Sequence, residues 1–160
     1  MTGWKGMMAA GIALSALAGC YSFGGGTLAY KTIGVPVAGN ATAEYRAPDA
    51  VTKAMLAALA KDGRIKVVEP ADAESRLVIG ITGYSRQPYQ YSRQEVVSQY
   101  KVTIIAKAAY LGKGDKEAWR SDSISVWSTY DAVSETEAAG IEKAASNLAA
   151  EIIRQAFEAW

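Results

Sequence analysis

Hydrophobic and polar positions alternate along the second half of the chain, and this pattern predicts three long β-strands. Apolar side chains recur at every second position within residues 76–84, 96–110 and 117–130, and mostly polar residues lie between them. Such alternation is typical of strands that bury one face and expose the other to water. The segment 111–116 between the last two strands is rich in glycine and charge, which indicates a hairpin turn.

Two further segments carry apolar residues at helical spacing. The first has Pro48 in its opening turn and Gly63 after its end, and the second follows a Ser-Glu-Thr-Glu capping box at 134–137. Short strands are expected at 31–37 and 64–68. The resulting order, β-α-β-β-β-β-α, predicts an α+β fold in which two helices pack on one face of a mainly antiparallel four- to five-stranded sheet, a two-layer sandwich.

The first twenty residues have the layout of a bacterial export signal. One charge, Lys5, precedes an apolar run that is too short for a comfortable membrane span and ends in Leu-Ala-Gly-Cys20. This ending resembles the lipobox of lipoproteins, in which cleavage leaves the cysteine first and its sulfur carries a diacylglycerol. We expect a lipoprotein signal peptide at 1–19, lipidated Cys20 with a flexible tether at 20–29, and a single α/β domain at 30–160. The alternative is an ordinary export signal with an incidental buried cysteine.

The residue after Cys20 bears on the destination of the protein. In bacterial lipoproteins an aspartate there retains the protein at the inner membrane, whereas this chain has Tyr21. The sorting rule therefore favours the outer membrane, with the domain on its periplasmic side. Two or three acyl chains, palmitate among them, would hold the protein there stably.

Composition narrows the range of functions. The 160 residues include 17 basic and 16 acidic residues, one cysteine and no histidine. A formal charge of +1 argues against a nucleic-acid binder, and a chain without histidine has no His-based triad or His metal site. Two pairs of carboxylates could in principle do acid–base chemistry. However, Asp131 and Glu135 lie at an expected helix start, where acidic residues favour the helix dipole, and Asp115 and Glu117 lie on a solvated hairpin. We expect a binding or scaffold protein that is not an enzyme and uses no cofactor or metal.

Several stretches of the chain, taken together, resemble the LptE family of lipopolysaccharide (LPS)-assembly lipoproteins. They are the Gly-Cys20-Tyr-Ser-Phe sequence after the lipobox, residues 31–37 with Asn40, residues 61–64, 81–89, 100–104 and 129–131, and the terminal Trp160. The resemblance implies two helices on a four-stranded sheet. It also implies that the domain sits in the lumen of an outer-membrane β-barrel partner, LptD, helps that barrel to assemble, and helps pass LPS to the cell surface.

The contact surface of such a plug should be polar, because the lumen of an outer-membrane barrel is polar. The outward positions Ser123, Ser125 and Trp127 fit this surface, as do Tyr89 and Tyr91 in the hairpin expected before the second long strand. Trp and Tyr are also common interface anchors. The alternatives are that a neighbouring side chain covers Trp127 and that the two tyrosines pack locally at a loop tip.

Basic side chains on the sheet or its hairpins are candidates for LPS contact, because LPS carries phosphates and sugar carboxylates. Between Tyr84 and Arg120 the chain has seven basic and three acidic residues, whereas residues 131–160 have six acidic and two basic residues. The candidates are Arg86, Arg93, Lys101, Lys107, Lys113 and Lys116. For each of them the alternative is an ordinary solvated charge.

Two other outer-membrane lipoprotein functions stay open at this point. An adaptor that activates a cell-wall synthase generally needs a long tether, but only about ten residues separate Cys20 from the first expected strand. A secretion-pore subunit that assembles into a ring needs a hairpin with lipid-facing alternation, but the hairpins here carry lysine and arginine. Both features favour a partner at the membrane itself.

Overall fold

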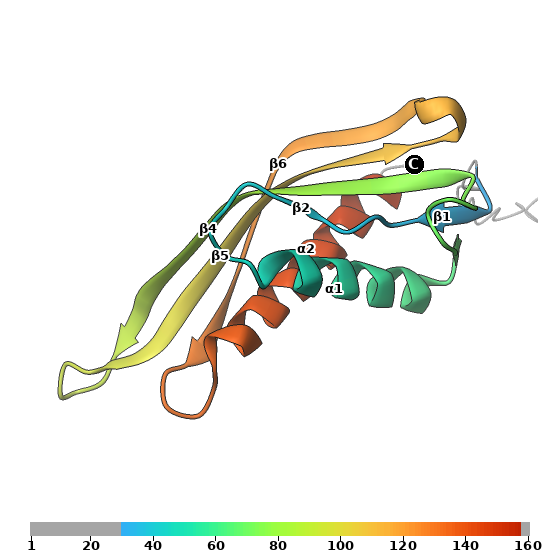
Figure 1. Ribbon diagram of the computed structural model, residues 1–160. Coiled ribbons are helices and arrows are strands. Elements are labelled where there is room, and N and C mark those ends of the chain that lie inside the picture. The colour runs from blue at the N-terminus through green and yellow to red at the C-terminus, as the bar shows by residue number, and fades with distance from the viewer. Residues whose placement is uncertain (1–29, 158–160) are drawn as a thin grey trace, which may run out of the picture.

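A six-stranded mixed sheet with two helices on one of its faces makes up residues 30–157, the part of the chain that this computed structural model describes (Figure 1). In chain order the elements are β1 (Thr32–Gly34), β2 (Gly39–Asn40), α1 (Ala47–Asp62), β3 (Lys66–Val67), β4 (Ser75–Tyr91), β5 (Val97–Leu111), the short 3-10 helix η1 (Lys113–Asp115), β6 (Glu117–Asp131) and α2 (Glu137–Phe157). The expected signal peptide, Cys20, the tether and Trp160 lie outside the described residues.

The predicted α+β two-layer class is confirmed, although the sheet has six strands instead of four or five. The strands lie in the order β3-β1-β4-β5-β6, and β4 also pairs with β2, a strand that the sequence analysis does not predict. β4, β5 and β6 form long antiparallel pairs, whereas β1 pairs in parallel with both β3 and β4. The parallel pairs arise because α1 and then the turn at 68–74 return the chain to the same end of the sheet.

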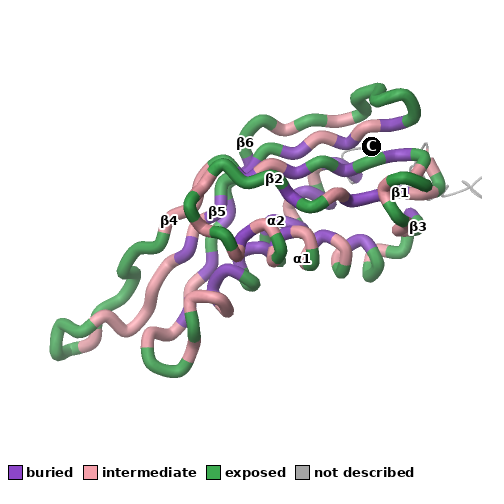
Figure 2. Tube along the Cα trace, viewed as in Figure 1, coloured by how far each residue is buried: buried purple, intermediate pink, exposed green. Residues whose placement is uncertain are grey.

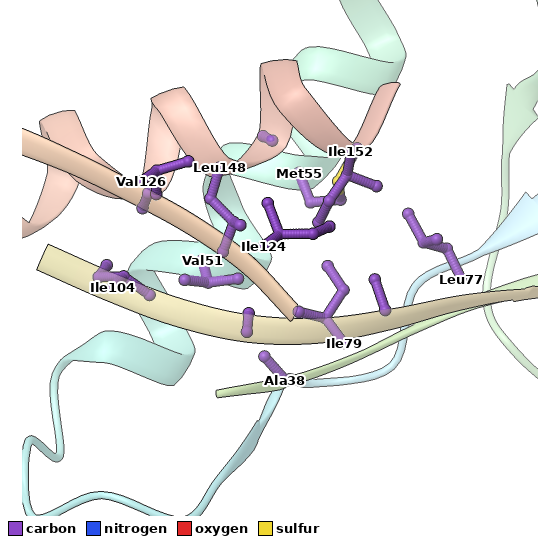
Figure 3. Packing of buried hydrophobic residues seen from close by; sticks show 14 of the residues in the cluster. Ala38, Val51, Met55, Leu77, Ile79, Ile104, Ile124, Val126, Leu148 and Ile152 are labelled. Carbon is purple, nitrogen blue, oxygen red and sulfur yellow. The ribbon is translucent and has the colours of Figure 1, made fainter. Parts of the chain in front are cut away.

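The core lies between the helices and the face of the sheet that they cover. It includes Leu77, Ile79, Ile104, Ile124 and Val126 from the sheet and Val51, Met55, Leu148 and Ile152 from the helices (Figure 3). These are the positions that the strand alternation and the helical spacing predict to point inward. The two periodicities in the sequence therefore identify the buried face of each long element correctly.

Both ends of α1 follow the sequence signals. Pro48 lies in the first turn, and Gly63 after the last residue has a φ of 71°, a left-handed conformation that costs glycine little. The Gly63 N–H donates to the Leu59 carbonyl at 3.1 Å and caps the helix. The Arg64 guanidinium then donates to the Phe157 carbonyl at 3.0 Å, which joins the end of α1 to the end of α2.

The capping box predicted for α2 is wrong. The helix begins at Glu137, and the hydroxyl of Thr136 accepts the Ala139 N–H at 3.3 Å. Ser134 instead donates its N–H and its hydroxyl to Asp131 Oδ1, at 2.8 and 2.9 Å. A charged carboxylate is a stronger acceptor than a neutral oxygen, so Asp131 holds Ser134 in the turn before the helix.

Thr136→Ala should therefore destabilise the domain by about 1 kcal/mol, because the first turn of α2 loses its side-chain acceptor. Ser134→Ala keeps the backbone bond to Asp131 and should cost less than about 0.5 kcal/mol, as most exposed substitutions do. Urea unfolding followed by circular dichroism compares the two variants. A larger loss for the serine variant would show that Ser134 is the cap after all.

β4 is longer than the sequence predicts. The apolar alternation stops near Tyr84, but the strand continues to Tyr91 and pairs with β5 along this whole extension. The hairpin expected at 84–93 is therefore mostly strand, and its turn is formed by residues 92–96. This end of the β4–β5 hairpin projects beyond both helices in Figure 1, and its surface is largely exposed in Figure 2.

Candidate functional site on the open face of the sheet

Both helices cover one face of the sheet and leave the other without a covering layer (Figure 1). We call this second face the open face. Cross-strand pairs place Lys101 and Thr103 of β5 beside Thr129 and Trp127 of β6 on it. Its large apolar side chains are only partly covered, with exposed fractions of 50% for Trp127, 46% for Tyr89, 42% for Val78 and 36% for Ile105.

An aromatic cluster of Tyr89, Lys101 and Trp127 lies on the open face near the start of β5. The two ring centroids are 6.0 Å apart and their planes are inclined by 36°. Lys101 Nζ lies 5.0 Å from the centroid of the Trp127 ring, where an exposed ammonium is attracted by about 0.5–1 kcal/mol. Ser123 and Ser125, further along β6, are exposed as their outward positions predict. The cluster thus presents two half-exposed rings and a cation beside a hydroxyl-bearing strand.

A shallow hollow of about 500 Å³ lies further along the same face, and its lining includes Val37, Val78, Lys107, Ala109 and Arg120. Small residues create it: a Cβ added at Gly80 would lie 3.1 Å from Lys107 Cε, so the lysine side chain lies directly over the glycine. Arg120 approaches Glu117 and Asp122 at 3.4 and 3.7 Å. The ion pairs of residues 30–157 include neither Lys101 nor Lys107.

The six basic residues singled out in the sequence do not form one patch. Lys101 and Lys107 lie on the open face. Arg93 lies in the β4–β5 turn, whereas Lys113 and Lys116 lie at the β5–β6 turn at the opposite end of β5. Two lysines of the set therefore share a face with the aromatic cluster. Arg120 lies on the same face beside Lys107, but the sequence analysis did not include it among the candidates. Alternation along β6 could not have found Arg120, because the register shift between Ala106 and Ala108 reverses the faces of β6 before Ser123 and turns this even-numbered residue outward.

Arg86 lies on the other side of the sheet. It pairs across strands with the buried Val102, and its guanidinium carbon lies 4.0 Å from the centroid of the Tyr100 ring. That ring in turn stacks on Tyr130, with centroids 5.5 Å apart. Arg86 therefore continues the helix-covered face beyond the ends of the helices and cannot act together with Lys101.

A polar network ties the starts of both helices to β4. Tyr84 donates to Glu137 Oε1 at 2.6 Å, and Arg46 lies 3.4 Å from the same carboxylate and 2.8 Å from Glu44. Burial, helped by the bond to Glu137, raises the pKa of Tyr84 well above its usual range. The hydroxyl therefore stays protonated and remains a donor, which suits a structural tie better than proton transfer.

The carboxylates considered for acid–base chemistry already have partners. Asp131 accepts backbone N–H groups from residues 133 and 134, which lower its pKa. Glu135 accepts from Lys143 at 2.5 Å, which lowers its pKa as well. Neither group is poised to exchange a proton near neutral pH. Within residues 30–157 no cluster of three or more acidic residues could hold a metal ion, and neither helix is long and apolar enough to cross a membrane.

These features define a two-layer α+β domain, and the same fold is found in bacterial lipoproteins of known structure. A putative lipoprotein from Caulobacter crescentus has a TM-score of 0.50 and 19% identity, and the match covers 75% of this chain and 83% of that one. A minor lipoprotein from Acinetobacter baumannii has a TM-score of 0.51 and 14% identity, and the match covers 82% of this chain and 94% of that one. The chain of the PelC dodecamer from Paraburkholderia phytofirmans has a TM-score of 0.52 and 16% identity, and the match covers 83% of this chain and 92% of that one. At these identities the likeness concerns the fold alone.

The family is shown by the sequence of the domain itself. Residues 30–156 match the model of the LptE family, described as lipopolysaccharide-assembly, and the chain belongs to that family. The expected resemblance is thereby confirmed, and the role described for this family lies in LPS assembly. No curated protein is significantly similar to the chain.

Proposed function

We propose that this protein is an outer-membrane lipoprotein that plugs an LptD-like β-barrel, assists its assembly and helps deliver LPS to the outer leaflet. Membership of the LptE family supports LPS assembly as the setting. The observation that carries the proposed contact is the open face, where half-exposed Trp127 and Tyr89 lie beside Lys101 and the exposed serines of β6.

The open face suits the lumen of a barrel better than a lipid surface or a protein core. Ser123, Ser125 and Thr129 contribute hydroxyl groups along β6, and barrel interiors are lined by polar side chains. Trp127 and Tyr89 add two rings that can pack into a partner and anchor it. Tyr91, which is 62% exposed near the β4–β5 turn, would extend the same contact toward the projecting end.

The same face also fits a ligand that is both anionic and apolar. Lys101 and Lys107 offer two ammonium groups to phosphates or sugar carboxylates. Ile105 lies exposed between the two lysines on β5, and Val78 of β4 lies exposed just beyond Lys107, so both supply apolar surface. We therefore propose LPS contact at Lys101 and Lys107 in particular. The cations at the two turns and Arg86 lie too far from this surface to share one ligand group with them.

Cys20 is proposed as the lipid attachment site, and its replacement gives a direct test. Cys20→Ala should abolish labelling with radioactive palmitate and release the protein from the membrane fraction, because no other thiol in the chain can accept the lipid. The thermal unfolding of the domain at 30–157 should not change. A variant that still incorporates palmitate would contradict the lipoprotein assignment.

Affinity purification of the tagged, lipidated protein from detergent-solubilised outer membranes tests the function as a whole. We expect a large β-barrel protein at equal stoichiometry, identified by mass spectrometry. A cell-wall synthase in its place, or a ring made of copies of this chain alone, would leave the fold intact and contradict the proposed function.

A further inference from the structure

β6 is an edge strand whose outer backbone groups can be assigned. The strand order ends at β6, so only β5 pairs with it. Asn147 Nδ2 donates to the Trp127 carbonyl from outside the sheet at 2.8 Å, and the Ala132 N–H donates inward to Ser98 of β5 at 3.0 Å. Backbone groups alternate in direction along an antiparallel strand. Even-numbered residues of β6 therefore bond to β5, and odd-numbered residues from Ser123 to Thr129 direct their N–H and C=O groups outward.

These outward groups form a nearly unoccupied ladder. Apart from the bond of Asn147 to Trp127, the hydrogen bonds found within residues 30–157 include none to the outward groups of Ser123, Ser125 or Thr129. The Asn147 side-chain amide donates to the Trp127 carbonyl in the way that the backbone N–H of a neighbouring strand would. The edge therefore already accepts one donor of the kind that an added strand supplies.

The sequence of this edge lacks the usual protection against pairing. Residues 123–129 read Ser-Ile-Ser-Val-Trp-Ser-Thr, without charge, proline or glycine. Exposed edges are normally guarded by charges, prolines or bulges, because free ladder groups recruit other strands. An unguarded run of seven residues, about 23 Å long, matches a docking edge.

The free edge of β4 provides the contrast within the same sheet. Because Val102 and Tyr100 bond to β6, their partners on β4, Arg86 and Pro88, turn their backbone groups away from β5. Pro88 has no N–H to offer, and register shifts interrupt β4 on both sides of Gln90. One edge of the projecting sheet is thus blocked, whereas the other is left open.

We propose that β6 binds its partner by strand addition, with an extended segment of the barrel protein pairing with the outward groups of residues 123–129. This inference rests on the proposed function and specifies how the contact is made. A closed barrel wall has no free edge, so the added strand comes from a loop or terminal segment of the partner that lies within its lumen. Polar side chains of that segment would continue the hydroxyl-bearing surface of the open face.

A second copy of this chain is a poorer occupant of the edge. If two copies paired along these seven residues, their contact would be about 23 Å long and only one strand thick. Such a contact covers far less than the roughly 1,000 Å² that a stable interface buries. A barrel segment that pairs with β6 also brings the rest of the lumen against Trp127 and Tyr89, so its contact continues over the open face.

Ser125→Pro tests the inference on the lipidated full chain, in the affinity purification described above. The substitution removes one outward N–H that β5 does not use, so the domain should keep its melting temperature to within a few degrees. Ser125→Ala is the matched control, because it removes the same hydroxyl and keeps the N–H. We expect the proline variant to recover at least tenfold less barrel protein than the alanine variant.

Amide-resolved hydrogen exchange on the unmodified protein provides a second readout if the proline variant fails to fold. The amides of Ser123 and Ser125 should exchange fast in the free lipoprotein and at least tenfold more slowly in the complex, whereas those of Ile124 and Val126 should be slow in both. Equal recovery by the proline and alanine variants, or fast exchange of the odd-numbered amides in the complex, would overturn strand addition and leave the proposed function standing. If the unmodified protein recovers no barrel, or only a second copy of itself, both proposals are wrong.

Discussion

Trp127→Glu should lower the recovery of the barrel partner about a hundredfold and leave the domain folded. Half of the ring is exposed, so in the free domain the change removes only its contacts with Tyr89 and Lys101. In the complex a desolvated carboxylate would replace an aromatic anchor of the kind that contributes at least about 2 kcal/mol to binding. A hundredfold loss corresponds to about 2.7 kcal/mol.

Quantitative co-purification and a thermal melt of each variant check this result. Val133→Glu is the control, because it makes the same change from apolar to acidic at a position that is 93% exposed in the loop before α2. Full recovery by the Trp127 variant would exclude the open face as the contact surface. A fall in melting temperature of more than about 5 °C would instead show that Trp127 supports the fold.

Gly140→Leu should destabilise the domain by about 3 kcal/mol, close to the upper end of the usual cost of overpacking. Gly140 lies in α2 where the helix approaches the sheet, and a Cβ there would be 2.5 Å from Tyr130 Cδ1 and 3.2 Å from Val102 Cγ2. Its carbonyl also accepts the Ser128 hydroxyl at 2.6 Å, so the helix cannot move away without breaking that bond.

Chemical denaturation of both the Gly140 variant and an Ala150→Leu control measures this effect. Ala150 is exposed on the same helix, so leucine there should leave the stability within about 0.5 kcal/mol. Equal midpoints for the two variants would mean that α2 can shift away from β6. The close approach at Gly140 would then not determine how the helix is seated.

Periodicity in the sequence predicted the long elements and their buried faces, but not the details that other parts of the chain decide. The two-residue strand β2 has no periodicity of its own and exists because β4 offers a partner at Gly80 and Ile81. The extension of β4 was missed because the apolar alternation stops near Tyr84, and Pro88 is tolerated within the extension because the strand has a free edge there. The cap of α2 was misassigned because Asp131 competes for Ser134.

The same limits apply to the candidate site. Alternation alone placed Ser123, Ser125 and Trp127 on one exposed face, and the structure agrees. Alternation could not relate Tyr89 to Trp127, because these rings meet across an intervening strand. Nor could it separate Arg86 from the lysines, because the register shift between Ile81 and Gly83 reverses the faces of β4 beyond that point.

The way the chain enters the sheet also has a mechanical consequence. β1 lies between β3 and β4, and hydrogen bonds fasten its start: the N–H of Lys31, just before the strand, donates to Glu74, and Thr32 accepts from both Glu74 and Ser75. A pull on the chain ahead of Tyr30, directed along β1, would load these bonds in shear, all at once, rather than open them one after another. Under the proposed lipidation of Cys20, a load from the anchor would thus be shared among the bonds of Lys31, Thr32 and their partners in the 74–75 segment.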